Sequence, residues 1–257
     1  MHPPSRPHWS TIEVGGHACE MFAPPDPVPG RALIFLHDAA GGGLEELHAL
    51  RDLVETARIP TLGPRAGGTW WLDRIVPGFD ARVTPERFVV DAVRGEAGRR
   101  WGVQPPGIAL VGVGMGGQGA LRLAYRHPAV FPVAAAIAPA IDFHAAMRDS
   151  HVRDDGAGYD ALWEVYGDVE RARQDTAILH VHPLNWPRHQ CFTSDPDDAD
   201  WHDGAVRLHS KLTALGIPHV AVLEPPGGRA TPHVDRVAAD VMRFLLDALD
   251  AESRRSA

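Results

Sequence analysis

The sequence predicts an α/β fold with a mainly parallel, doubly wound sheet and helices on both faces. Short apolar runs alternate along the chain with longer segments whose apolar residues recur at helical spacing. Three of the short runs, at residues 32–37, 108–113 and 131–137, are almost continuously apolar. Such runs are typical of strands buried on both faces of a parallel sheet. The 257 residues suit one domain, residues 1–257, and we find no internal repeat.

Composition argues against several classes of function. A formal net charge of −8 does not favour a nucleic-acid or membrane partner. The longest apolar stretch, residues 128–141, is too short to span a bilayer. Residues 1–10 are polar and proline-rich, so we expect a cytoplasmic protein. Cys19 and Cys191 lack the spacing of a metal site and suit a reducing compartment, although a disulfide between them remains an alternative. The sequence is also compatible with a homo-oligomer.

The first elements are predicted to be a hairpin, a strand and a helix. Two short runs flank Gly15 and Gly16, a pattern that indicates a β-hairpin. The apolar strand at residues 32–37 follows a proline-rich loop. Residues 44–58 carry leucines and a valine at helical spacing, which predicts a helix, and a short strand is expected at 59–62.

A second helix is predicted from its start signal. Thr84 is a suitable cap and Pro85 suits the first helical position, so we expect a helix that runs to about Arg100. Trp70 and Trp71 lie in the loop before it, among glycines and prolines. The two indoles either line a pocket or fill a gap at the surface.

The C-terminal half continues the alternation of strands and helices. Residues 142–176 interrupt it with a polar, irregular stretch. Gly216 is a suitable C-cap for the helix before it. The other predicted elements are strands at 131–137, 190–193 and 218–223 and helices at 201–215 and 233–249.

The most specific signal lies at residues 108–121. An apolar strand runs into Gly-Met-Gly-Gly-Gln-Gly, and a helix-like run follows. In α/β hydrolases a strand, tight turn and helix of this kind form the nucleophile elbow, Gly-x-Ser-x-Gly, with the serine at its tip. Here Gly114 occupies the tip. The backbone at the tip is strained by about 1–3 kcal/mol for residues other than glycine. Glycine removes this strain, so it is favoured at the tip once catalysis is not needed.

The residues after the tip identify a narrower resemblance. Residues 112–121 resemble the Gly-x-Ser-Met-Gly-Gly-x-Gly-Ala-Leu pattern of the esterase-D-like, or S-formylglutathione-hydrolase-like, group at every position except the nucleophile. The resemblance extends over residues 31–249. It implies an α/β-hydrolase fold, a small cap-like insertion at about 142–176, and an esterase chemistry that needs no cofactor.

The same resemblance implies an acid after the penultimate strand and a histidine after the last one. Asp198 is the preferred acid and Asp195 the second choice, because Asp195 stands at the glycine of the family's Gly-x-x-Asp. A solvated acidic turn is the alternative. Arg229 stands at the histidine of the family's Gly-Gly-His, and His233, four residues on, is a candidate substitute. Arg229 would either pair with Asp198 or bind a ligand.

The oxyanion loop also departs from the family pattern. His37-Asp38 stands where His-Gly is usual, at the end of the strand that leads into a glycine-rich loop. In the family, this loop and the residue after the nucleophile, here Met115, supply the oxyanion-hole amides. The residues expected around the pocket are His37, Asp38, Ala39, Met115, Trp70 and Trp71.

These departures favour a catalytically impaired protein, a pseudo-esterase that keeps a pocket for binding or regulation. A small-molecule ligand is expected, and an anion is one candidate, because Arg229 and a helix N-terminus would face it. The first alternative is an active carboxylesterase or thioesterase with a rearranged site that uses His233 and a water. The second is a lyase or cofactor-free oxygenase that uses His37, Asp198 or His233. No metal is expected, because His180 and His182 lack a third ligand.

Overall fold

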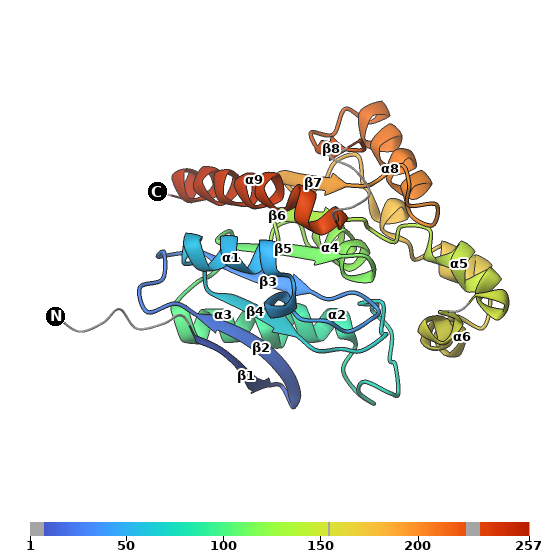
Figure 1. The fold of residues 1–257 in the computed structure, drawn as a ribbon, viewed down its shortest axis with the longest axis horizontal. Coiled ribbons are helices and arrows are strands. Elements are labelled where there is room, and N and C mark those ends of the chain that lie inside the picture. The colour runs from blue at the N-terminus through green and yellow to red at the C-terminus, as the bar shows by residue number, and fades with distance from the viewer. Residues whose placement is uncertain (1–7, 154, 225–231, 257) are drawn as a thin grey trace.

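An eight-stranded sheet, in the order β1-β2-β4-β3-β5-β6-β7-β8, forms the centre of the protein (Figure 1). The structure is a computed structural model that describes residues 8–153, 155–224 and 232–256. β1 and β2 pair in antiparallel fashion, β2 is antiparallel to β4, and every later pairing is parallel. The strands are β1 (His8–Val14), β2 (His17–Ala23), β3 (Ala32–Leu36), β4 (Thr61–Pro64), β5 (Ile108–Val113), β6 (Val133–Ile137), β7 (His189–Thr193) and β8 (Val220–Val222).

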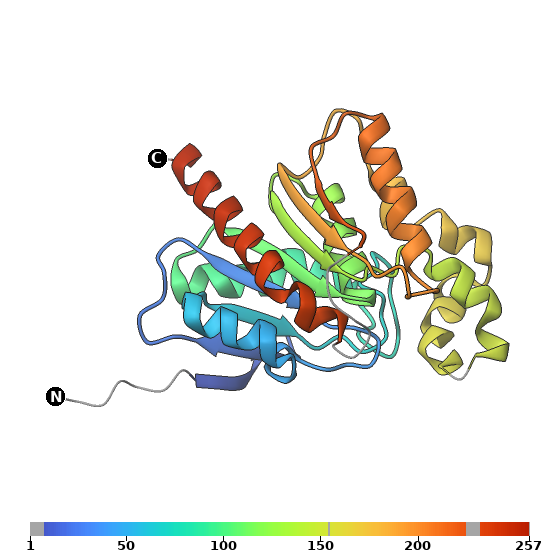
Figure 2. The same cartoon turned by 45° about the horizontal axis from the view of Figure 1, so that its top comes forward.

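Helices cover both faces of this sheet, as predicted. α1 and α9 lie together on one face, and α3 and α4 lie on the other (Figures 1 and 2). The α-helices are α1 (His48–Ala57), α2 (Pro85–Arg87), α3 (Arg94–Trp101), α4 (Met115–Arg126), α5 (Phe143–Asp149), α6 (Asp160–Tyr166), α7 (Val169–Arg173), α8 (His202–Ala214) and α9 (His233–Ser256).

The alternation of side chains along the central strands explains their apolar sequences. In β3, Leu33 and Phe35 pack against the face that carries α1 and α9, while Ile34 and Leu36 join the core on the opposite face. All five residues of β3 are buried. Because side chains alternate between the two faces of a strand, a strand covered by helices on both sides must be apolar at every position.

Several local predictions are confirmed and others shift by a few residues. Thr84 caps its helix, and its Oγ1 accepts a hydrogen bond from the Arg87 amide at 3.1 Å. The helix predicted at 44–58 is shorter, because a 3₁₀ turn at Leu44–Glu46 precedes α1. The strand predicted at 59–62 lies two residues later, as β4. The final helix extends beyond residue 249 to Ser256.

The two cysteines and the helices bear on the expected compartment and on membrane insertion. Cys19 and Cys191 are both buried and unpaired, so the disulfide alternative is not seen. In the described part of the chain, we find no helix with the length and hydropathy of a membrane span.

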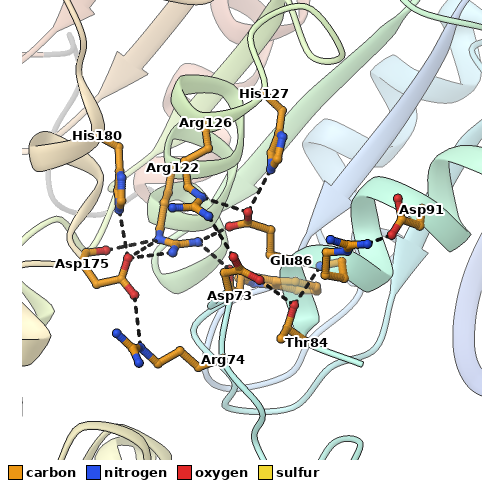
Figure 3. A network of polar contacts seen from close by, with 12 residues as sticks. Asp73, Arg74, Thr84, Glu86, Asp91, Arg122, Arg126, His127, Asp175 and His180 are labelled. Carbon is orange, nitrogen blue, oxygen red and sulfur yellow. Dashed lines mark hydrogen bonds and ion pairs between the residues drawn. The ribbon is translucent and has the colours of Figure 1, made fainter. Parts of the chain in front are cut away.

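The polar stretch at 142–176 folds into three short helices, α5, α6 and α7, beyond the sheet (Figure 1). A buried ion-pair network attaches it to α4 (Figure 3). The Arg122 side chain on α4 is 1% exposed, and its Nη2 lies 2.7 Å from Oδ1 of Asp175. Asp175 also accepts a hydrogen bond from the Tyr166 hydroxyl at 2.7 Å and lies 2.9 Å from His180 Nε2.

The opposite side of Arg122 holds a second buried carboxylate. Its Nη1 contacts Oε2 of Glu86, whose side chain is 1% exposed (Figure 3). Oε1 of Glu86 lies 2.8 Å from both Arg126 Nε and His127 Nε2. Burial opposes ionisation of Glu86, but His127, Arg122 and Arg126 outweigh it and lower its pKa to about 2. One buried arginine therefore links the start of the α2–α3 segment, α4 and the end of the 142–176 stretch.

Candidate functional site

The turn between β5 and α4 lies where the sequence predicts a nucleophile elbow. Gly114 adopts φ 55° and ψ −116°, a backbone conformation that residues with a side chain rarely adopt. Its amide donates to the Ile137 carbonyl at 2.9 Å, and its own carbonyl accepts from Gln118 and Ala140, both at 3.0 Å. These bonds join the turn to the end of β6 and to the first turn of α4. The turn predicted at residue 114 is therefore present, with no side chain at its tip.

The carboxylate of Asp38 occupies the space where a nucleophile side chain would stand. A Cβ atom built on Gly114 would overlap this carboxylate and lie 2.7 Å from its Oδ2. Oδ1 of Asp38 accepts hydrogen bonds from the amides of Met115 and Ala39, each at 2.8 Å. These are the two positions from which family resemblance predicts the oxyanion-hole donors. The Asp38 carboxylate therefore occupies both of the amides that were expected to serve as oxyanion-hole donors.

His37 holds the loop that carries Asp38. The imidazole is 2% exposed, and its Nδ1 lies 2.7 Å from the Asp38 carbonyl, to which it donates. Its Nε2 accepts from the Ala66 amide at 3.1 Å. Burial lowers the pKa of His37, which keeps the ring neutral. Both ring nitrogens are thus bonded to backbone groups, and the acid or base role considered from sequence stays a prediction.

Trp70 has the pocket role that was predicted, whereas Trp71 has neither predicted role, because it lies in the core and not at the surface. Trp70 lines the pocket, and its indole nitrogen donates to the Gly158 carbonyl at 3.1 Å. Trp71 is fully buried in the core, and its indole nitrogen donates to the His37 carbonyl at 3.3 Å. Both residues have positive φ, 56° and 54°, so the chain holds this loop in an unfavourable backbone conformation.

A cavity of about 310 Å³ opens in front of Asp38. Of the pocket residues expected from sequence, Asp38, Ala39 and Trp70 line it, whereas His37, Met115 and Trp71 lie outside its lining. The rest of the wall includes Asp155 and Tyr159 from the 142–176 stretch and Trp201 from the turn before α8. Sequence reasoning missed these three; the cap-like stretch was a signal for Asp155 and Tyr159, but nothing in the sequence pointed to Trp201.

The two candidate acids make different contacts. Oδ1 of Asp198 accepts from the amides of Asp200 and Trp201, both at 3.2 Å, just before α8 begins. Burial raises the pKa of Asp198. Asp195 forms an ion pair with Arg236 in the first turn of α9, and the Asp197 amide and Arg236 together lower its pKa. Asp195, the second choice, is thus the acid that contacts a basic side chain, while Asp198 caps a turn.

The residues expected at the histidine position are only partly described. Arg229 lies outside the described residues, so its predicted contact with Asp198 stays a prediction. His233 begins α9, and its Nε2 lies 3.0 Å from Oγ1 of Thr193 at the end of β7. Burial lowers the pKa of His233. Because Thr193 is 1% exposed, this hydroxyl–imidazole pair does not present a nucleophile to the cavity.

Two further features bear on chemistry. Ser194 lies 3.3 Å from His202 Nδ1, but its hydroxyl is fully buried. The His180 and His182 pair serves structural contacts, with Asp175 at 2.9 Å and with the Leu184 amide at 3.1 Å. Among the described residues, no group of three or more potential ligands is placed to hold a metal ion.

The strand order and the turn at Gly114 define the α/β-hydrolase fold. Within that fold the chain belongs to the esterase family whose model is described as "Putative esterase", and this model matches residues 88–246. The matched region contains the elbow and both candidate acids.

The similar proteins support the same assignment. Esterase Rv1288 of Mycobacterium tuberculosis strain H37Rv is 30% identical over 254 aligned residues, which cover 88% of this chain and 53% of the relative. The chain thus spans about half the length of this curated relative. FphF, a fluorophosphonate-binding serine hydrolase of Staphylococcus aureus, has a TM-score of 0.73 at 10% identity and covers 95% of this chain and 98% of its own. An S-formylglutathione hydrolase from Agrobacterium tumefaciens has a TM-score of 0.68 at 14% identity, over 96% and 94%. The two structural likenesses show the fold.

Proposed function

We propose that the protein is a catalytically impaired member of the esterase family that binds a small molecule in the pocket beside Gly114. The observation that carries the proposal is the position of the Asp38 carboxylate. It accepts the amides of Met115 and Ala39 and fills the side-chain space at the elbow. Two free, buried cysteines support a reducing compartment, for which we propose the cytoplasm.

Acyl transfer by an α/β hydrolase needs a nucleophile and vacant donors for the developing oxyanion. Loss of a single oxyanion-hole donor lowers turnover by a factor of about 10²–10³ in a well-studied protease. Here Asp38 uses two amides, and Gly114 supplies no hydroxyl. A second negative charge developing beside Asp38 would also be repelled. The acyl-enzyme route is therefore closed at two points, nucleophile and oxyanion hole.

Each of the two alternative functions meets an obstacle of its own. A rearranged esterase that uses His233 and a water still needs donors for the oxyanion, which Asp38 occupies. A lyase or oxygenase that uses His37 would need a ring nitrogen that is not already bonded to the backbone. Binding is the function that requires no rearrangement of these groups.

The test is ester hydrolysis by the full chain. Short-chain p-nitrophenyl esters should be cleaved no faster than in the presence of an unrelated protein at equal concentration. Turnover that survives repurification and disappears in a His233→Ala variant would support the rearranged esterase and contradict this proposal. The variant's melting temperature, compared with that of the parent, distinguishes lost chemistry from lost folding.

A further inference from the structure

We propose that this pocket binds an organic cation, a substituted ammonium group held between the Asp38 carboxylate and the aromatic rings of Trp70, Tyr159 and Trp201. The inference rests on the proposed binding function and names the chemistry of its ligand. It replaces the anion expected from sequence. The amides that would receive an anion are already bonded to Asp38, at 2.8 Å each.

Asp38 differs in its partners from three other partly or fully buried carboxylates of the protein. Glu86, Asp175 and Asp195 each form an ion pair with an arginine. Within the described ranges, Asp38 has two amide donors on Oδ1 and no basic side chain within ion-pair distance. It also lines the cavity whose wall includes Trp70, Tyr159 and Trp201. A ligand cation would supply the countercharge that the described protein does not.

The rim of the pocket is acidic as well. Arg153 is shared by two carboxylates, with Nε 2.7 Å from Asp155 and Nη2 2.8 Å from Asp200. Two negative charges, one of them on the pocket-lining Asp155, therefore meet one positive charge. The same guanidinium lies over the Tyr159 ring, with its carbon 5.5 Å from the ring centroid. A cation of the chain itself thus already uses one aromatic side chain of this wall.

The aromatic side chains suit the apolar surface of a substituted ammonium group. The Trp70 and Tyr159 rings stack with centroids 5.5 Å apart. The indole nitrogen of Trp70 is engaged by the Gly158 carbonyl, which fixes the orientation of the ring. Ring faces attract cations through their quadrupole, and aromatic cages for quaternary ammonium groups use this interaction. A cavity of about 310 Å³ is at the small end of ligand pockets, so the cation should be a compact head group.

The test compares two compounds of the same shape and different charge. Choline carries a trimethylammonium group, and 3,3-dimethylbutan-1-ol replaces this group by a neutral tert-butyl group. Calorimetric titration of the full chain should show saturable binding of choline and at least a tenfold weaker affinity for the alcohol. Sodium acetate should not bind. Equal affinities for choline and the alcohol, or saturable acetate binding, would overturn the proposal.

Variants connect this binding to the pocket. Asp38→Asn keeps the size of the side chain and removes its charge, so choline affinity should fall at least tenfold. The matched control is Asp52→Asn on the exposed surface of α1, which removes the same charge and should leave the affinity unchanged. Unchanged choline affinity in a folded Asp38→Asn variant would overturn the inference.

A second pair of variants covers the case in which Asp38→Asn does not fold. Trp201→Leu should weaken choline binding, whereas Trp163→Leu, at a site that is 40% exposed on α6, should not. Equal effects of the two would contradict a cage around the cation. Ester assays separate this inference from the proposed function. Ester turnover together with Asp38-dependent choline binding would contradict only the proposed function. A protein that neither hydrolyses esters nor binds choline would contradict only the inference.

Discussion

The carboxylate of Asp38 accepts the amide hydrogen of Met115 at 2.8 Å, although 77 residues separate the two positions in sequence. A carboxylate oxygen at this place resembles the oxyanion that this amide would stabilise in an active hydrolase. The contact joins the loop after β3 to the first residue of α4. It therefore ties two segments together beside the pocket, and in the proposed function it also blocks the acyl-enzyme route.

A serine returned to the elbow should be destabilising because of Asp38. Gly114→Ser introduces a side chain at φ 55° and into the Asp38 carboxylate. We expect a loss of about 1–3 kcal/mol in the free energy of unfolding from backbone strain alone, and a larger loss from the overlap. In an Asp38→Gly background the loss should be smaller, by about 0.5–3 kcal/mol.

Urea denaturation of the two single variants and the double variant measures this coupling. Gly95→Ser in α3 is the control, because a Cβ at that exposed glycine meets nothing within 4 Å. Equal losses from Gly114→Ser in both backgrounds would show that Asp38 does not obstruct the elbow.

Esterase activity should return only when three positions change together. Asp38→Gly vacates the amides, Gly114→Ser supplies the nucleophile, and Arg229→His supplies the base at the position that the family resemblance implies. Each single variant should be inert, because a serine without a base is a poor nucleophile and a base without a serine has nothing to activate. Triad residues are strongly non-additive for this reason.

The measurement is the p-nitrophenyl acetate rate of the triple variant beside its three single and three double variants. A triple variant that folds and stays inert would show that the acid has diverged too. Asp195, which is already paired with Arg236, would then be the first position to change.

Removal of Arg122 should destabilise the protein severely. Arg122→Met leaves Glu86 and Asp175 buried without their shared partner. Breaking a buried pair in this way costs about 3–5 kcal/mol. The control is Arg87→Met, in an ion pair whose side chains are 66% and 57% exposed. Exposed pairs contribute about 0–1 kcal/mol, so the control should keep nearly the full unfolding free energy. Similar losses in the two variants would contradict a structural role for the network.

Acid should weaken the same network over a defined range. The folded-state pKa of Glu86 is lowered from 4.5 to about 2, chiefly by His127, Arg122 and Arg126 acting against burial. A lowered folded-state pKa contributes stability above the unfolded-state pKa, and this contribution is lost as pH falls from 4.5 through about 2. Urea midpoints measured at pH 6, 4 and 3 should therefore decline, and the decline should be shallower in Glu86→Gln. Parallel declines in the two proteins would assign the acid sensitivity to other groups.

Much of the fold could be predicted because it depends on local patterns. Apolar runs at β3, β5 and β6 report burial on both faces, and glycines at 15 and 16 report a hairpin turn. The boundaries were less accurate where tertiary contacts decide them. Leu44 is buried in a 3₁₀ turn ahead of α1. Its amide donates a hydrogen bond of 2.8 Å to the carboxylate of Glu20, which lies in β2.

The sequence by itself determined the family, the turn at Gly114 and the glycine at its tip, because these follow from a contiguous motif of ten residues. It also singled out Asp38 as a departure from the family pattern. Only the tertiary structure decided what Asp38 does and which aromatic side chains share its pocket. Asp38, Met115, Tyr159 and Trp201 come from separate segments, and their meeting depends on how β3, α4, the 142–176 stretch and α8 pack. Contacts of such long sequence separation leave no periodic trace in the sequence, since each partner satisfies only its own local pattern.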